Sequence, residues 1–130
     1  MTNFIKMKTA LFIGLGGFAG SITRYYVSKI NLIPALSTIP LGTLLVNIAG
    51  SFLLGLLTGI ADRSLLLSVE WRMFLMVGFC GGFTTFSTFA SENLLMMRNG
   101  NFQGMFLYTA LSVFLAFLFV YLGYNLSKLL

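Results

Sequence analysis

The sequence GFCGGFTTFSTF at residues 78–89 brings glycine, hydroxyl and aromatic side chains together within an apolar stretch. Its hydroxyl groups come from Thr84, Thr85, Ser87 and Thr88. Phe86 and Phe89 are three residues apart, so they share one face of a helix. Hydroxyls donate hydrogen bonds to an anion, and the edge of a phenyl ring is electropositive. Together these groups can surround an anion without offering it a fixed cation that would retain it.

The same segment is not expected to continue as a regular helix. The pair Gly81 and Gly82 relaxes the backbone, and the following hydroxyls compete for its hydrogen bonds. In lipid, a broken backbone is tolerated only where it is buried in protein or lines a polar cavity. An isolated pair of phenylalanines usually fills space in a core or faces lipid. The interleaved hydroxyls instead favour a site that handles a polar solute at membrane depth.

Composition identifies a membrane protein. Of the 130 residues, 58% are apolar and only 8% are charged, whereas soluble domains have about 25% charged residues. The net charge of +5 comes from basic residues spread singly between apolar stretches, which is typical of membrane anchors and not of a nucleic-acid surface. The single cysteine, Cys80, excludes an intrachain disulfide.

Four apolar segments are long enough to cross a bilayer as helices, which takes about 20 residues. They run over residues of about 9–30, 41–61, 72–97 and 102–124. We therefore expect an all-α membrane protein, with residues 1–130 forming one four-span domain whose third helix is broken. The first span also has features of a cleaved signal sequence, but its apolar run continues past the small residues that would mark cleavage. It is therefore counted as a span.

Two further spans carry polar side chains with more than one interpretation. Asn47 in the second span must find partners, either by linking helices or by replacing the water around a passing ion. Tyr108 and Ser112 in the fourth span are four residues apart, so they share a face. They either extend a polar track or bond to a neighbouring helix.

The charged residues near the spans leave similar alternatives. Arg24 either extends toward lipid headgroups or attracts anions at a vestibule. Glu92, after the expected break, is either functional or interfacial. The sequence has no histidine and no cluster of acids, nor any pairing of a nucleophile with a base, so an enzyme is excluded. The basic residues favour one side of the membrane only modestly, which permits insertion in both orientations.

The third-span sequence GFCGGFTTFSTF resembles the signature of the Fluc (CrcB) fluoride channels. The first-span GLGGFAGSITRY and the second-span GTLLVNIAGSFLLG resemble that family's other two blocks, in the same order. The resemblance covers essentially the whole chain. It implies a dual-topology homodimer, with two antiparallel subunits in the membrane and two separate fluoride pores.

The resemblance also implies roles for individual residues. The fluoride pore would be lined by Phe86, Phe89, Asn47, Tyr108, Ser112, Thr85, Ser87, Thr88 and, in a vestibule, Arg24. Backbone carbonyls of Gly81 and Thr84 from both subunits would hold a structural Na+ at the dimer interface. One position departs from the polar track of some members, because Ala116 stands one turn beyond Ser112. We therefore do not expect a side chain to bind the ion at that end.

The implied function is a passive, fluoride-selective channel in the cell inner (plasma) membrane that exports cytoplasmic fluoride and lowers its toxicity. The main alternative is a proton-coupled exporter of the small-multidrug-resistance type, which has a similar plan. Such exporters need an acid in the first span, where this chain has Arg24. A second alternative is an assembly subunit without transport, whose small residues only pack. It does not explain the break in the third span.

Overall fold

The structure is a computed structural model that describes residues 2–29, 39–63 and 67–130. Within these ranges every regular element is a helix. The elements in chain order are α1 (Thr2–Ser28), α2 (Leu41–Arg63), α3 (Val69–Arg72), the π-helix η2 (Met73–Cys80), α4 (Gly81–Phe83), α5 (Phe86–Arg98), α6 (Phe102–Leu126) and the 3₁₀ helix η3 (Ser127–Leu129). The chain is therefore all-α over its described residues.

Three helical stretches of the described chain are long and apolar enough to cross a membrane, namely Leu41–Arg63, Val69–Arg98 and Phe102–Leu129. The first helix, α1, has 27 residues but is not among them. It begins at Thr2, earlier than the predicted start at residue 9, because a helix can continue beyond the apolar layer where water solvates its charged residues. Lys8 in this extension pairs with Glu70 at 2.9 Å. The predicted end of the first span at Ile30 lies outside the described residues.

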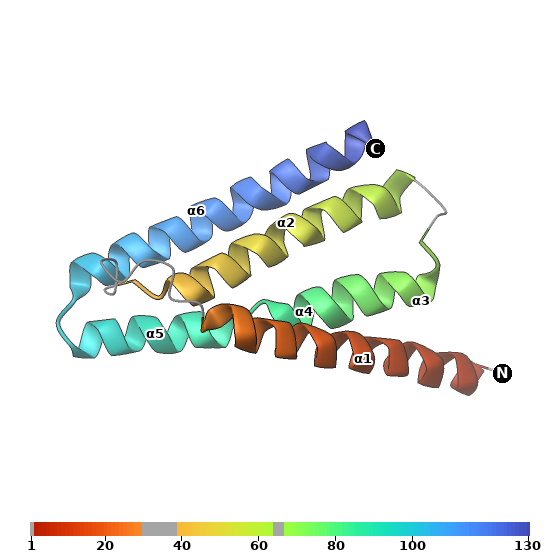
Figure 1. The fold of residues 1–130 in the computed structure, drawn as a ribbon, viewed down its shortest axis with the longest axis horizontal. Coiled ribbons are helices and arrows are strands. Elements are labelled where there is room, and N and C mark those ends of the chain that lie inside the picture. Colours follow the sequence, from red (N-terminus) through yellow and green to blue (C-terminus); the bar gives the residue numbers. More distant parts are fainter. Residues whose placement is uncertain (1, 30–38, 64–66) are drawn as a thin grey trace.

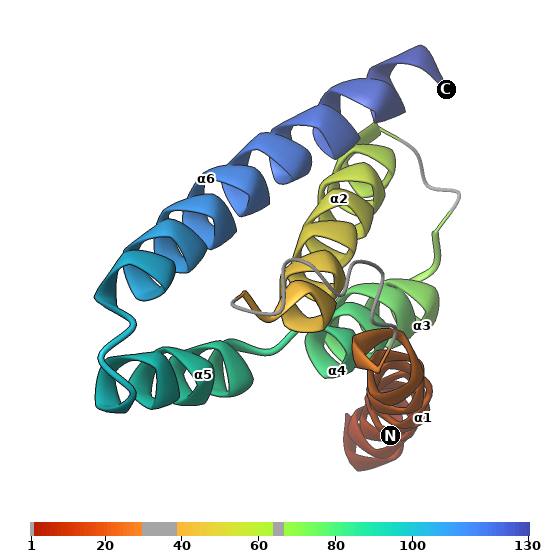
Figure 2. The ribbon, with the colours of Figure 1, turned by 60° about the vertical axis from the view of Figure 1, so that its left-hand side comes forward.

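Successive passes of the chain alternate in direction along the long axis, and both termini lie at the same end (Figure 1). The helix α1 lies beside η2 and α4, while α2 lies beside α6 (Figures 1 and 2). Two closely packed helix pairs therefore form the molecule, and α2 also contacts the third pass.

Glycines allow the backbones within each pair to touch. A Cβ atom added to Gly16 or Gly20 of α1 would lie 2.2 Å from the carbonyl oxygen of Phe74 or Phe79 respectively. In the other pair, a Cβ added to Gly55 of α2 would lie 2.1 Å from the carbonyl oxygen of Val120. Small residues four apart are a common way to bring membrane helices close together, because lipid supplies no hydrophobic force between them. Gly16 and Gly20 thus form the packing face of α1.

A tight turn joins α5 to α6 and sets the two helices side by side. Gly100 has φ of +72°, a conformation that glycine adopts without the steric cost of a side chain. The Asn101 side chain then accepts a hydrogen bond from Gly104 N at 3.0 Å and caps α6. This turn brings the residues that follow the third-span break next to the first half of α6.

The contact between α1 and η2 is testable with two glycines of the same helix. We expect Gly20→Ala to destabilise the protein by about 1–3 kcal/mol, since the new methyl group would overlap a backbone carbonyl that cannot move aside. Gly14→Ala is the matched control, because no atom lies within 4 Å of its added Cβ. Thermal unfolding in detergent measures both. Equal melting temperatures for the two variants would contradict this account of the helix contact.

Candidate functional site

The third pass loses its helical geometry at Thr84 and Thr85. Thr84 has φ −80° and ψ 157°, and Thr85 has φ −151° and ψ 115°, both extended. Helix α4 therefore ends at Phe83 and α5 begins at Phe86. Thr85 caps the new helix, because its hydroxyl accepts a hydrogen bond from Thr88 N at 3.2 Å.

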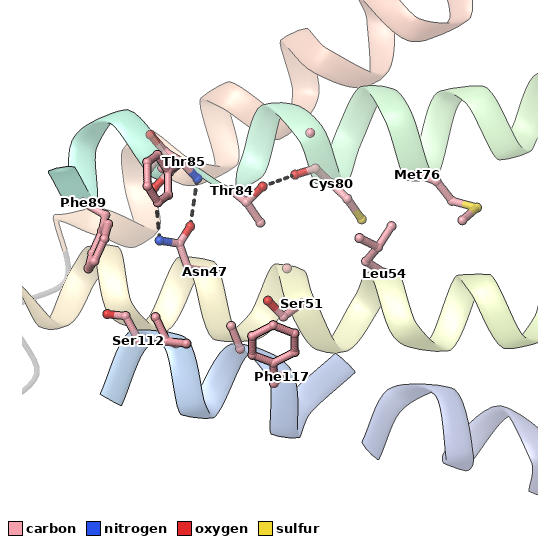
Figure 3. Close-up of a pocket in the computed structure, with 15 residues that line it drawn as sticks. Asn47, Ser51, Leu54, Met76, Cys80, Thr84, Thr85, Phe89, Ser112 and Phe117 are labelled. Carbon is pink, nitrogen blue, oxygen red and sulfur yellow. Dashed lines mark hydrogen bonds between the residues drawn. The ribbon is translucent and has the colours of Figure 1, made fainter. Parts of the chain in front are cut away.

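Asn47 of α2 supplies the hydrogen bonds that the extended residues need (Figure 3). Its Oδ1 accepts from Thr85 N at 2.8 Å, and its Nδ2 donates to the Thr85 carbonyl at 3.1 Å. In a continuous helix, the Thr85 N–H would instead bond to the carbonyl of Gly81. The Asn47 amide thus compensates for the interruption and ties it to α2.

The hydroxyls around the break are partly engaged with one another. The Thr84 hydroxyl donates to the Cys80 carbonyl, four residues earlier, at 2.9 Å. Thr85 is 8% exposed, and its hydroxyl lies 3.0 Å from the Thr88 hydroxyl and 3.4 Å from that of Ser87. The side chains of Ser87 and Thr88 are exposed, so they can exchange these partners for others.

Three aromatic rings form a row beside the break. The ring centroids of Phe86 and Phe89 are 5.6 Å apart, and those of Phe89 and Tyr108 are 5.2 Å apart. Phe86 begins the row with 79% of its surface exposed, while Tyr108 ends it fully buried. The row thus leads from the open face of the protein into the interface between α5 and α6.

A cavity of about 410 Å³ opens at the break between α2, the third pass and α6 (Figure 3). Among its lining residues are Asn47, Thr84, Thr85, Phe86, Phe89 and Ser112. Gly81 and Ala116 also border it, and no charged side chain of the described chain does. Within the described residues the buried hydroxyl oxygen of Ser112 has no hydrogen-bond partner.

A second cavity, of about 290 Å³, lies on the other side of Thr85. It contains Arg24, whose Nη1 donates to the Thr84 carbonyl at 3.5 Å. Residues that bear hydroxyl groups also line this cavity, namely Ser21, Tyr25, Ser28, Thr43, Thr85 and Thr88. Thr85 borders both cavities. The second contains the guanidinium of Arg24, whereas no charged side chain of the described chain lines the first.

Glu92 joins three helices one turn beyond the aromatic pair. Thr43 of α2 donates to its Oε1 at 2.7 Å, and Tyr108 of α6 donates to its Oε2 at 2.7 Å. The sequence alone did not decide whether Glu92 is functional or interfacial, and it did not predict Thr43 as a site residue. The available signal was the spacing of Thr43 four residues before Asn47, which puts both on one face of α2.

The structure thus brings most of the candidate residues to one region, in two groups. The neutral cavity contains Gly81, Thr84, Thr85, Phe86, Phe89, Asn47 and Ser112. Arg24 and Thr88 border the second cavity, and Ser87 is exposed beside Thr85. Tyr108 lies outside both linings, with its hydroxyl on Glu92. Tyr108 and Ser112 share a helix face, but only Ser112 reaches the neutral cavity.

These features define a multi-pass helical membrane protein with a polar site at an interrupted span. A family profile described as CrcB-like protein, Camphor Resistance (CrcB), matches residues 11–124. The chain belongs to the CrcB family and is not an enzyme.

Similar curated proteins bear the name fluoride-specific ion channel FluC. The chain is 46% identical to the one from Bacteroides fragilis, over 94% of this chain and 98% of the relative. It is 43% identical to that of Campylobacter fetus, over 97% and 98% of the two chains. It is 41% identical to that of Pyrococcus abyssi, over 95% and 99%.

The role of the Asn47 amide is testable by Asn47→Leu, which conserves its size. Because the substitution leaves the Thr85 N–H unpaired in a buried position and removes one of the bonds to its carbonyl, we expect a loss of about 1–3 kcal/mol. Faster hydrogen exchange at the Thr85 amide is the local measurement. Ser51→Ala is the control, since Ser51 borders the same cavity but makes neither of these bonds. Unchanged protection at Thr85 would contradict the assignment.

Proposed function

We propose that this chain forms a fluoride-selective, passive channel of the plasma membrane that lowers the toxicity of fluoride by exporting it. The observation that carries the proposal is the cavity at the interrupted span, where neutral donors and phenylalanine rings meet without a charged side chain from the described chain. The names of the relatives supply the identity of the ion.

Fluoride is small and strongly hydrated, so a pore has to replace its water with hydrogen-bond donors. The unpaired hydroxyl of Ser112 and the second N–H of the Asn47 amide are such donors in the neutral cavity. A fixed cation there would retain the ion, because unit charges attract strongly at low dielectric constant. Conduction requires binding that is strong enough for entry and weak enough for release, which neutral donors and ring edges provide.

Arg24 fits a vestibule role in this scheme. Its guanidinium lies in the second cavity, so it raises the local anion concentration without contacting the neutral one. The hydroxyls of Thr85, Thr88 and Ser87 then form the passage to the phenylalanine pair. Tyr108 serves the ion by turning its hydroxyl away from Glu92.

The complete channel, in this proposal, is an antiparallel homodimer with dual topology and four spans in each subunit, of which α1 is the first. The alternating passes and the shared end of the two termini support an even number of spans (Figure 1). Phe86 is 79% exposed and the neutral cavity is open, which supports a second copy that closes it. Two pores then result, one from each copy's set of residues.

A structural sodium ion at the dimer interface fits the donor set. The Thr85 N–H bonds to Asn47, which frees the Gly81 carbonyl from its usual helical donor. Gly81 is exposed, and no atom lies within 4 Å of its added Cβ, so a partner can approach closely. Carbonyl oxygens at an interrupted helix suit a hard cation. The Thr84 carbonyl accepts a long hydrogen bond from Arg24 and has a second lone pair with which it can bind the cation.

Export needs no energy coupling in this mechanism. Hydrogen fluoride crosses a bilayer unaided and ionises inside the cell. The membrane potential, worth about 2.3 kcal/mol per charge at 100 mV, then drives the anion outward through a passive pore.

An efflux assay in proteoliposomes tests the function. We expect rapid release of fluoride, no release of chloride and no accompanying exchange of protons. A proton-coupled exporter would instead show drug-dependent proton flux, for which the intramembrane carboxylate of Glu92 is the candidate carrier. Absence of any flux would favour a packing subunit. Either of these results would overturn the proposed function.

Phe86→Ile is the sharpest test of the aromatic edges. The substitution keeps an apolar side chain but removes the ring, so we expect fluoride flux to fall at least tenfold while the dimer still assembles. Phe117→Ile is the matched control, because Phe117 borders the same cavity, is 75% exposed and is not in the row with Phe89. Wild-type flux in Phe86→Ile would remove the ring from the mechanism.

The sodium ion is testable by ion replacement. Prolonged exchange of sodium for N-methylglucamine, whose size prevents it from entering a site made of four carbonyls, is expected to shift the purified protein from dimer toward monomer. Light scattering coupled to gel filtration measures the change, and restored sodium should reverse it. A dimer indifferent to the cation would exclude a structural sodium ion.

A further inference from the structure

A second polar contact links α5 to α6 directly beside the one made by Glu92. Thr109 Oγ1 donates to Asn93 Oδ1 at 2.9 Å, and Asn93 Nδ2 donates to the Phe89 carbonyl at 2.9 Å. Since Glu92 and Asn93 are consecutive, as are their partners Tyr108 and Thr109, the two contacts form adjacent rungs between the same helices.

We infer that Asn93 and Thr109 are positioning residues, which keep α5 docked on α6 while the Tyr108 hydroxyl leaves Glu92 to serve a passing ion. The inference rests on the proposed channel function and adds to it two residues that have no contact with the ion.

A second polar contact between α5 and α6 is needed because the Tyr108 hydroxyl can donate only one hydrogen bond. The hydroxyl of Tyr108 has one proton, so it cannot donate to Glu92 and to an anion at the same time. When it turns to the ion, the carboxylate of Glu92 keeps only its bond from Thr43, which comes from α2. The polar link between α5 and α6 at this level is then the one between Asn93 and Thr109.

Apolar packing holds α5 only weakly. Among its described residues Met96 alone is buried, and much of the rest is exposed. An interhelical hydrogen bond inside a membrane shifts a two-state equilibrium by about three- to twentyfold. That is enough to decide whether such a helix stays in register.

Asn93 also reaches the aromatic row. It lies four residues after Phe89 on the same helix face. Its amide donates a hydrogen bond to the Phe89 carbonyl and accepts one from the Thr109 hydroxyl. The ring of Phe89 packs against Tyr108 with centroids 5.2 Å apart. Loss of the Asn93–Thr109 bond would therefore let Phe89 of α5 move relative to Tyr108 and Ser112 of α6, while none of these three residues changes.

Unitary fluoride current in planar bilayers tests the inference, because it reports only on assembled channels. Thr109→Val removes the hydroxyl at constant size and is expected to lower the unitary current about three- to tenfold. Thr109→Ser restores the hydroxyl and should return the current to near the wild-type value. Thr58→Val is the matched control, since the Thr58 hydroxyl bonds only to the Leu54 carbonyl of its own helix.

Asn93→Leu provides an independent variant. Because it breaks the same bond, its effect on the unitary current should not add to that of Thr109→Val in the double variant. A merely stabilising role would reduce the number of channels and leave the current of each unchanged.

Three outcomes would overturn the inference: a wild-type unitary current in Thr109→Val, additive effects in the double variant, or no channels from Thr109→Val when Thr109→Ser conducts. A wild-type protein without fluoride current would instead overturn the proposed function itself.

Discussion

The requirement that every backbone polar group in a membrane find a partner governs this structure. Thr84 and Thr85 leave the helix at a depth where water does not replace the lost bonds. The Asn47 amide accepts a hydrogen bond from the Thr85 N–H, which has lost its helical partner, and donates a second one to the Thr85 carbonyl. The break is consequently a fixed feature of the fold, positioned by a side chain from another helix.

The pairing of buried polar groups also links the two helix pairs to each other. Glycine contacts bind α1 to η2 and α2 to α6, and Gly42 and Gly50 of α2 also lie close to α1 and to the third pass respectively. The Asn47–Thr85 bonds join α2 to the third pass, and the Glu92 carboxylate joins α2, α5 and α6. Close packing therefore acts within and between the pairs, and buried hydrogen bonds add specific links between α2, the third pass and α6.

Some of this architecture was predictable from residue type and spacing. Apolar length located the second and fourth spans to within a few residues. Spacing could not decide between two interpretations of Asn47, because its partner depends on how α2 is rotated against the third pass. The same dependence concealed the bonds of Glu92 with Thr43 and Tyr108, which need three helices in register. The π-helical geometry of residues 73–80, which lie against α1, also has no marker in residue type.

The distribution of charge around the break has a functional logic of its own. Arg24 lies in a second cavity that shares Thr85 with the neutral cavity, and Glu92 accepts hydrogen bonds from the hydroxyls of Thr43 and Tyr108. A guanidinium raises the concentration of anions over several ångströms, whereas it would retain an ion in direct contact at low dielectric constant. In the proposed channel, this arrangement would attract an anion without giving it a strong binding site. The Glu92 carboxylate one turn further on would then repel the anion at short range and favour its release.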